Sequence, residues 1–406
     1  MRRSLSVRPA AVAGAAALGL MLLPLSAPAS AGAAPARSGV TWTIQPSPNQ
    51  PGEPASQLNA VSCVKGGQCA AVGIYSTGKG VPEHQFTLAL ERTGTKWVRE
   101  PTPSIKGVGY SLFNGVSCTS ASSCIAVGYT VGSKRLSPPI RTLAERWNGA
   151  SWAVQAAPAL NDASLAGVSC PVPSFCLAVG GFLKTPRSAN EQPLAEVWDG
   201  KSWSQLTAPN PHAENGSAFT GVACIAAGKC EVTGDFDYAD VAQSVFAYGL
   251  NGTSWTAQKQ VNPVGQQINS DASVSCTSTS ACTSVGSWTN TQALSLTERW
   301  NGTSWSRQAI PHPPGSVTDS LAGVSCTAAA ACTAVGESAT NLNDSPSSTE
   351  AMTWNGTSWQ LAATPNRAGT SDALNGVSCT TPTTCVAVGS SFNFPSGATL
   401  IEVSSG

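Results

Sequence analysis

The sequence has few charged residues: Asp, Glu, Lys and Arg make up 11% of its 406 residues, and the formal net charge is zero. Proteins that bind mainly nucleic acid or anionic membranes carry a basic excess, so the composition argues against both partners. Histidine is rarer still, with three residues and no nearby G-x-S-x-G motif. A Ser-His-Asp hydrolase is therefore not expected.

Long hydrophobic runs are missing after the N-terminal segment, where a membrane helix would need roughly 18 unbroken apolar residues. Arg2 and Arg3 precede the apolar residues 10–25, and an Ala-x-Ala pattern follows at residues 27–31. This order is typical of a secretory signal. We expect residues 1–31 to be a signal peptide and 32–40 a short linker, so that the protein is secreted and has no membrane span.

Cysteine is abundant, with 14 residues that all fall in C-x5-C pairs recurring every 50 to 55 residues. An oxidising compartment favours disulfides, and zinc sites prefer a shorter C-x2-4-C spacing with histidine. The expected bridges are Cys63–Cys69, Cys118–Cys124, Cys170–Cys176, Cys224–Cys230, Cys276–Cys282, Cys326–Cys332 and Cys379–Cys385.

Each cysteine pair lies in a repeat that reads like L-A-G-V-S-C-T-A-A-A-A-C-T-A-V-G at residues 321–336, followed later by W-N-G-T-S-W. A period near 50 residues with about four short strands predicts a propeller blade. Strand A ends at V-S-C, strand B begins at the second cysteine, strand C ends near E-R-W, and strand D begins at the second Trp. Asn-Gly favours the hairpin turn between strands C and D, and at Asn251, Asn301 and Asn355 it is also a glycosylation sequon.

The two ends of the repeat region complement each other. V-T-W-T-I-Q-P-S-P at residues 40–48 matches strand D of other repeats, and T-L-I-E-V at 399–403 matches strand C. The N-terminal strand is therefore predicted to complete the last blade and remove an open sheet edge. The predicted fold is all-β: a monomeric seven-bladed β-propeller over residues 41–406 with one local disulfide per blade.

The motifs G-V-S-C, C-x-A-V-G and W-N-G-x-S-W resemble a family of largely uncharacterised secreted actinobacterial repeat proteins, which implies the same architecture and no catalytic residues. A looser likeness is to the Asp-box propellers of sialidase type, because Gly302, Ser304 and Trp305 fall where that motif places Gly, Ser or Thr, and an aromatic residue. Trp300 stands where the box has its Asp.

Acidic residues recur at two positions of the repeat. Residues shared by most blades are expected to be structural, because one site does not need seven copies. The glutamates near the end of strand C are predicted to lie on the outer surface, three of them paired with the following Arg. Asx-turns account for the aspartates before strand A. These two sets are Glu91, Glu145, Glu196, Glu298 and Glu402, and Asp162, Asp271, Asp319 and Asp372.

The loops between strands B and C and between blades vary in length, whereas the A–B and C–D turns are short. Both variable sets leave the same face of a propeller, which is predicted to be the working face. Aromatic residues recur there, either to pack between blades or to stack on a glycan or peptide. These ligand-binding candidates are Tyr75, Tyr129, Phe182, Phe236, Trp288 and Phe392.

The fourth repeat departs most from the others and reads C-E-V-T-G-D-F-D-Y-A-D from Cys230 to Asp240. Its Asp235, Asp237 and Asp240 are further ligand-binding candidates. They offer oxygen ligands for calcium, although the spacing lacks the glycine and closing glutamate of the twelve-residue calcium loop. A solvated acidic loop is the preferred interpretation, and no cofactor or other metal is expected.

These features lead to a hypothesis of an extracellular, non-enzymatic binding propeller whose partner is a glycan or a protein. The alternative is a polysaccharide-active hydrolase or lyase, which needs two carboxyl groups about 5–9.5 Å apart at the channel mouth. A third possibility is an envelope protein in which the propeller acts as a spacer.

Overall fold

The computed structural model describes residues 40–49, 55–77, 84–133, 139–160, 162–185, 190–211, 216–238, 242–260, 268–289, 291–341, 346–393 and 396–406. The predicted signal peptide and all but the last residue of the predicted linker lie outside these ranges. The described residues form 28 β-strands. Among them no helix has the length and apolar character that crossing a membrane requires.

The strands form four-stranded units, each an antiparallel meander. Unit 1 consists of β2 (Ser56–Cys63), β3 (Cys69–Thr77), β4 (His84–Thr93) and β5 (Lys96–Glu100). Unit 2 consists of β6 (Val108–Ser120), β7 (Ser123–Gly132), β8 (Ile140–Trp147) and β9 (Trp152–Gln155). Unit 3 consists of β10 (Ala163–Val172), β11 (Phe175–Leu183), β12 (Glu191–Trp198) and β13 (Trp203–Leu206). Unit 4 consists of β14 (Ser217–Ala226), β15 (Lys229–Tyr238), β16 (Ala242–Asn251) and β17 (Ser254–Gln258).

The remaining strands follow the same order. Unit 5 consists of β18 (Ile268–Ser278), β19 (Ala281–Thr289), β20 (Ala293–Trp300) and β21 (Trp305–Arg307). Unit 6 consists of β22 (Thr318–Ala328), β23 (Ala331–Ala339), β24 (Ser347–Trp354) and β25 (Trp359–Ala362). Unit 7 consists of β26 (Ser371–Cys379), β27 (Cys385–Asn393), β28 (Ser396–Ser405) and, from the other end of the chain, β1 (Thr41–Ile44).

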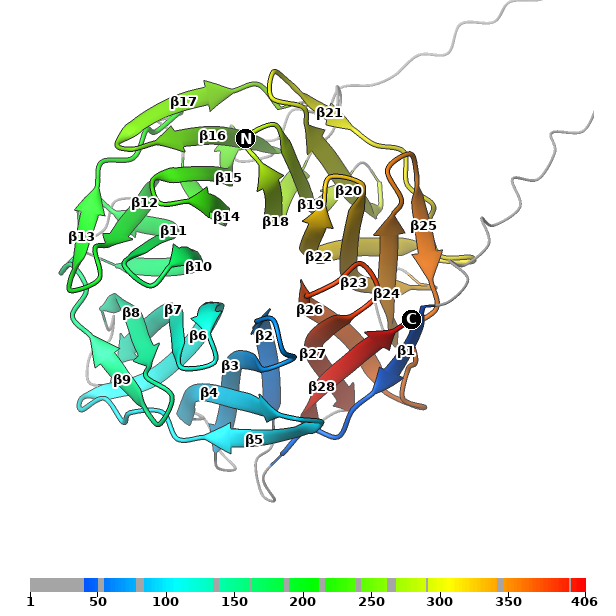
Figure 1. Cartoon of the computed structure of the whole chain (residues 1–406), viewed down its shortest axis with the longest axis horizontal. Coiled ribbons are helices and arrows are strands. Elements are labelled where there is room, and N and C mark those ends of the chain that lie inside the picture. The colour runs from blue at the N-terminus through cyan, green and yellow to red at the C-terminus, as the bar shows by residue number, and fades with distance from the viewer. Residues whose placement is uncertain are drawn as a thin grey trace, which may run out of the picture. The chain divides into compact units, whose positions relative to one another are not determined.

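The units lie side by side around a central opening, with the first strand of each unit innermost (Figure 1). β1 pairs antiparallel with β28, in the register Trp42 to Ser404. Single parallel residue pairs also join unit 1 to unit 2 and unit 4 to unit 5, at Gln85 with Tyr110 and Gln243 with Ile268. The prediction of an all-β propeller of four-stranded sheets is confirmed.

All seven expected disulfides are present, and no cysteine is free. Each joins the end of a unit's innermost strand to the start of its second strand, across a short turn. The Asn-Gly turns are confirmed as well. Asn148 Oδ1 accepts hydrogen bonds from the amides of Ala150 and Ser151, and Gly149 has a positive φ of 94°.

A bulge interrupts the innermost strand of each unit four positions before its first cysteine, as between Leu58 and Ala60 in unit 1. At this point the strand approaches the second strand so closely that a Cβ at Gly73 would clash with the carbonyl oxygen of Gln57. The glycine that ends A-V-G is therefore required by a close backbone approach rather than by a turn.

The serine of V-S-C links neighbouring units. Its hydroxyl accepts a hydrogen bond from the amide of the first cysteine in the next unit, as Ser117 does from Cys170 at 2.9 Å. Ser378 of unit 7 does the same for Cys63 of unit 1. Unit 4 has Ala223 at this position, so the described residues lack the equivalent bond to Cys276. The full set of these links is Ser62–Cys118, Ser117–Cys170, Ser169–Cys224, Ser275–Cys326, Ser325–Cys379 and Ser378–Cys63.

The hydrophobic core lies between units. The cluster between units 2 and 3 contains Ile125 and Val127 from one unit and Leu165 and Trp198 from the next. Apolar residues on both faces of each sheet are thus buried only when a neighbouring sheet is present. This arrangement explains why the repeat needs its neighbours to be stable.

The predicted surface position of the strand C glutamates is wrong. Glu145, Glu196, Glu298 and Glu402 are fully buried. Glu196, for example, contacts Thr142 of the neighbouring unit, because this side of the third strand faces an adjacent sheet. Burial raises the pKa of Glu145 to about 8 and that of Glu196 to about 7.

Glu91 does not belong to this glutamate set, because it lies one residue further along its strand. Leu90 pairs with Ala71, whereas Glu145 pairs with Ala126, and both alanines follow the second cysteine of their unit by two positions. Leu90 therefore occupies the place of Glu145.

Candidate functional site

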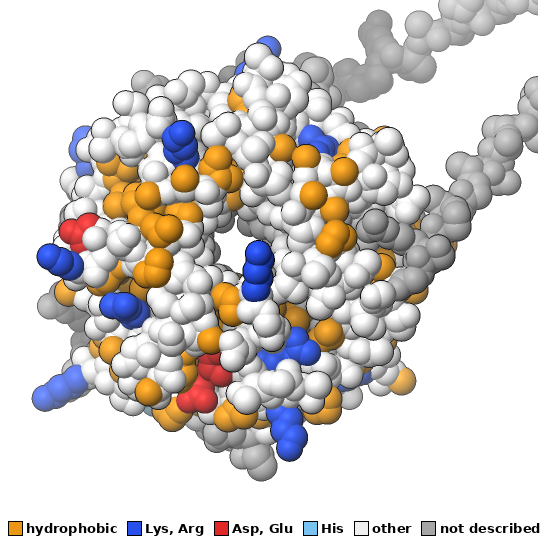
Figure 2. All heavy atoms as spheres, in the orientation of Figure 1, with side chains coloured by type: hydrophobic (Ala, Val, Ile, Leu, Met, Phe, Trp, Pro, Cys, Tyr) orange, Lys and Arg blue, Asp and Glu red, His pale blue; other side chains and the backbone are white. Residues whose placement is uncertain are grey.

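The central opening of the ring is visible in the space-filling view (Figure 2). It forms a cavity of about 170 Å³ to which each unit contributes three consecutive residues around its bulge. None of the lining residues is charged: they are Asn, Ala, Gly, Val, Thr and Ser. Asn59, Asn114 and Asn375 donate hydrogen bonds to carbonyl groups of the next unit, so their amide groups serve the scaffold.

The six predicted aromatic candidates lie on the second strands of six different units, so the structure does not bring them together. Tyr75 and Trp288 are partly buried, and each has one ring face covered by an arginine. The Arg99 guanidinium lies 3.9 Å from the Tyr75 ring centre, and that of Arg307 lies 4.4 Å from the Trp288 ring centre.

The other four aromatic candidates differ in exposure. Phe236 is buried in the core between units 3 and 4, and Phe182 packs against the core between units 2 and 3. Tyr129 stacks on Tyr110 with ring centres 5.8 Å apart. Phe392 is 43% exposed and is the one large solvent-facing ring of the set.

The acidic candidates of unit 4 are only partly described. Asp235 Oδ2 accepts a hydrogen bond from Ser270 Oγ of unit 5 at 3.2 Å. Asp240 and the side chain of Asp237 lie outside the described residues. Within the part of the chain that the structure describes, no group of three or more His, Cys, Asp or Glu side chains has the arrangement of a metal site.

The aspartates before strand A are anchors between segments, so the Asx-turn interpretation is wrong for three of them. Asp162 accepts a hydrogen bond from the Ile140 amide, and Asp319 accepts one from the Ser295 amide and one from His312 Nδ1 at 2.9 Å.

Asp271 is fully buried and accepts hydrogen bonds from the side chains of Gln260 and Ser284. Asp372 is the local case: it accepts hydrogen bonds from the Arg367 amide and Thr370 Oγ1.

A second cavity, of about 230 Å³, lies between units 4 and 5. It opens at the edge of the ring where the short turns and disulfides lie, opposite the predicted working face. Its walls are the ends of β14, β16 and β18, the starts of β15 and β19, and parts of β17 and β20. The lining residues are Ala223, Ile225, Lys229, Cys230, Glu231, Gly249, Leu250, Asn251, Thr256, Gln258, Cys276, Ser278, Thr279, Cys282 and Trp300.

Three residues that line this cavity are smaller than their counterparts in unit 2. Gly249 stands where unit 2 has Arg146, Leu250 where it has Trp147, and Ala223 where it has a serine. The equivalent space between units 2 and 3 is lined by Arg146 and measures only about 10 Å³. The loss of one long side chain and the shortening of two others leave the space between units 4 and 5 open.

Glu231 is the single carboxyl group among the lining residues. It stands opposite Gly249 in the β15–β16 ladder and is 6% exposed. Its Oε2 accepts a hydrogen bond of 3.0 Å from Gln258 Nε2, and Gln258 Oε1 accepts one of 2.7 Å from Trp305 Nε1 of unit 5. Its Oε1 has no hydrogen-bond partner among the described residues.

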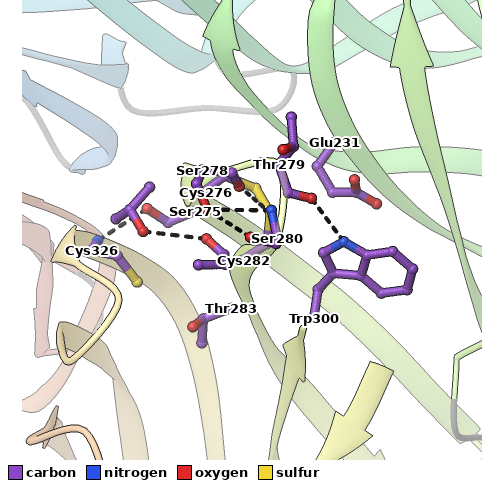
Figure 3. Close-up of a disulfide and its surroundings, with 12 residues drawn as sticks. Glu231, Ser275, Cys276, Ser278, Thr279, Ser280, Cys282, Thr283, Trp300 and Cys326 are labelled. Atoms are coloured by element: carbon purple, nitrogen blue, oxygen red, sulfur yellow. Dashed lines mark hydrogen bonds between the residues drawn. A yellow bond between two sulfur atoms is a disulfide. The ribbon is translucent and has the colours of Figure 1, made fainter. Parts of the chain in front are cut away.

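Burial raises the pKa of Glu231 to about 7, while the hydrogen bond from Gln258 acts in the opposite direction. Among the described residues, no cation forms an ion pair with this carboxyl group. Figure 3 shows it on the same side of the Cys276–Cys282 disulfide as the Trp300 indole, whose Nε1 donates to the Thr279 carbonyl at 3.0 Å. An acid beside an aromatic ring suits a cationic or hydrogen-bond-donating group.

Glu231 is not among the residues predicted from the sequence. A signal is present, because unit 4 is the most divergent repeat and has Glu231 and G-L-N at residues 249–251, where unit 2 has R-W-N. The aspartates further along the same strand were the more conspicuous feature. The importance of Glu231 depends on the side chain missing at Gly249, and their pairing becomes visible only in the sheet register.

No protein-family model matches the chain, and no curated protein matches it. Among solved structures, the chain is similar to YCF48 bound to a D1 peptide, with a TM-score of 0.53 and 12% identity over 93% of this chain and 99% of that one. A six-bladed propeller, the fucose-binding lectin of Aleuria aurantia, gives a TM-score of 0.45 and 14% identity over 76% and 96% of the two chains. The Penicillium chrysogenum α-L-arabinanase complexed with arabinobiose gives 0.45 and 9% over 91% and 98%. At these identities the likeness to YCF48 shows the fold alone.

Proposed function

We propose that the chain is a secreted, non-enzymatic binding protein built on a closed seven-bladed propeller, with a glycan or a protein as its partner. The observation that carries the binding role is the cavity between units 4 and 5, whose one carboxyl group, Glu231, has an oxygen without a hydrogen-bond partner among the described residues. Such a group orients a ligand through charge and hydrogen bonding.

Two features support the closed ring. The hydrogen bonds from the Cys63 amide to Ser378 and from Asn375 to the Leu58 carbonyl join the last unit to the first. β1 completes the sheet of unit 7. Seven disulfides, together with the N-terminal signal pattern, support export, because disulfides persist in oxidising compartments.

The hydrolase alternative finds less support. Glycoside hydrolysis uses a pair of carboxyl groups about 5–9.5 Å apart. The lining of the central cavity contains no carboxyl group, and the lining of the cavity between units 4 and 5 contains only Glu231. The buried strand C glutamates lie within the ring between sheets, where a polysaccharide has no access.

The test is a glycan array and a cell-envelope pull-down with the purified secreted chain, followed by product analysis of any glycan that binds. We expect retention without cleavage. Release of shortened products would overturn the non-enzymatic role, and capture of no glycan and no protein would overturn the binding role.

Matched variants separate the two faces of the ring. Gly249→Arg fills the cavity at the short-turn edge, whereas Tyr75→Ala and Trp288→Ala alter the variable-loop face. If the partner lies on the variable-loop face, the alanine variants are expected to weaken binding by about 1 kcal/mol or more. If it occupies the cavity, only Gly249→Arg has an effect.

A further inference from the structure

The interface between units 5 and 6 shows which group can occupy a position equivalent to the cavity between units 4 and 5. At the next interface, Arg299 of unit 5 extends across to unit 6, and its guanidinium lies 4.6 Å from the Trp354 ring centre. Its Nη1 donates to Thr283 Oγ1 at 3.1 Å, and its Nη2 donates to the Ala329 carbonyl at 2.7 Å. The guanidinium is therefore held by a ring, a side-chain oxygen and a turn carbonyl.

The interface between units 4 and 5 keeps the acceptors and lacks the guanidinium. Trp300 corresponds to Trp354, because each pairs with the second cysteine of its unit. The Thr279 carbonyl corresponds to that of Ala329, since both residues follow the first cysteine of their unit by three positions. Glu231 corresponds to Thr283, since it pairs with Gly249 as Thr283 pairs with Arg299. Unit 4 therefore has the carboxylate of Glu231 where unit 5 has the hydroxyl of Thr283. It has Gly249 where unit 5 has Arg299.

Resting on the proposed binding function, we infer that this cavity binds the guanidinium of an arginine side chain presented by a partner polypeptide. A planar guanidinium stacks on an indole and supplies several N–H donors in one plane, which a point-like ammonium does not. The group would place its charge beside Glu231, its plane against Trp300 and one N–H toward the turn of unit 5.

The size of the cavity agrees with a side chain as occupant. About 230 Å³ is smaller than the roughly 300–1,000 Å³ of pockets that enclose whole small-molecule ligands. Lys229, the one cation among the lining residues, is exposed at the rim and makes no ion pair with Glu231 within the described residues. The buried acid therefore still lacks a positive partner.

The substitution Gly249→Arg is expected to fill the cavity with a side chain of the protein itself. A Cβ on Gly249 would lie 3.7 Å from Glu231 Oε2 and 3.0 Å from Nε2 of the flexible Gln258 side chain. Gly249→Arg should therefore place its own guanidinium in the cavity after a small movement of Gln258, as Arg299 does one interface later.

The test is calorimetric titration of the full secreted chain with acetyl-Gly-Arg-Gly-amide and with the same peptide containing citrulline, the neutral isostere of arginine. We expect the arginine peptide to bind at least tenfold more tightly. Glu231→Gln should remove this preference, and Gly249→Arg should abolish binding. Glu337→Gln on β23 of unit 6, outside the cavity lining, is the matched control and should change nothing.

Equal affinity for the two peptides, no binding of the arginine peptide, or unchanged binding by Glu231→Gln would overturn the guanidinium site. If Gly249→Arg does not fold, the test is whether Glu231→Gln loses the preference for the arginine peptide. A chain that captures a glycan or envelope protein but does not distinguish the peptides keeps the proposed function and loses this inference. A chain that captures nothing and ignores both peptides loses both.

Discussion

The interface between units 2 and 3 and the one between units 4 and 5 use the same positions of the repeat with opposite results. At the first, Ile125 and Arg146 face each other across the ladder, and a space of about 10 Å³ remains. At the second, Glu231 and Gly249 replace them, and the space is about 230 Å³. One interface is closely packed, and the other has a buried acid beside an open cavity.

The hydrophobic clusters show the same contrast. Twelve buried residues form the core between units 2 and 3, against five between units 4 and 5. The fully buried Asp271 even takes the place that Leu165 has in unit 3, as both precede their cysteine by five positions. The residues that depart from the repeat here reduce the buried apolar surface. Such departures are expected mainly where function requires them.

The largest effect should come from moving the open interface to units 2 and 3. The double change Ile125→Glu and Arg146→Gly places a buried carboxylate there without a partner and removes apolar packing. We expect the free energy of unfolding to fall by about 3–5 kcal/mol in urea denaturation. A loss below about 1 kcal/mol would mean that the two interfaces tolerate the same residues equally well.

The second prediction concerns pH. The folded pKa of Glu231 is about 7, above the ordinary value of 4.5, so between these values the folded state holds a proton that the unfolded state has released. Stability therefore falls as the pH rises through this range, by roughly 1.4 kcal/mol for each unit between the two pKa values. Glu231→Gln should make the melting temperature depend less steeply on pH between pH 5 and pH 7.

Glu196, buried in the packed interface, provides the comparison for this pH effect. Burial raises the pKa of Glu196 to about 7 as well, so Glu196→Gln should flatten the profile to a similar degree. A flat profile in the unaltered protein would contradict the prediction for both carboxyl groups.

The third prediction reverses the first. Glu231→Ile with Gly249→Arg restores the residues of unit 2, fills the cavity and removes a buried charge. We expect a gain of about 1–2 kcal/mol in the free energy of unfolding. A crystal structure of this variant should show the introduced arginine side chain across the interface, and an unfilled cavity would contradict the comparison with unit 2.

The smallest effect is expected from the missing serine link. Ala223→Ser supplies the hydroxyl that accepts the Cys276 amide hydrogen bond, as in six other places, and should add about 1 kcal/mol. The matched change Ser117→Ala removes the bond to Cys170 and should lose a similar amount. If both variants melt like the unaltered protein, the serine links do not contribute to stability.

The sequence predicts the strands and disulfides well, because turn chemistry and cysteine spacing act over a few residues. The burial of Glu145 could not be predicted in this way. A polar residue in a strand indicates an exposed face only if that face meets water, and here a neighbouring sheet covers it. Glu231 required the opposite inference: its meaning depends on Gly249, 18 positions later, and on Trp300 of another unit.

The pairing of β1 with β28 affects the order in which strands can pair during synthesis and folding. The two strands are about 360 positions apart, so the first strand to be synthesised receives its partner last. Until then β1 offers a free edge, and units 1 and 7 lack their mutual bonds. Closure of the ring therefore requires a non-local strand pairing, a kind of contact that forms slowly compared with local hairpins. The local disulfides, each closing within a single unit, let the other units form while that step is pending.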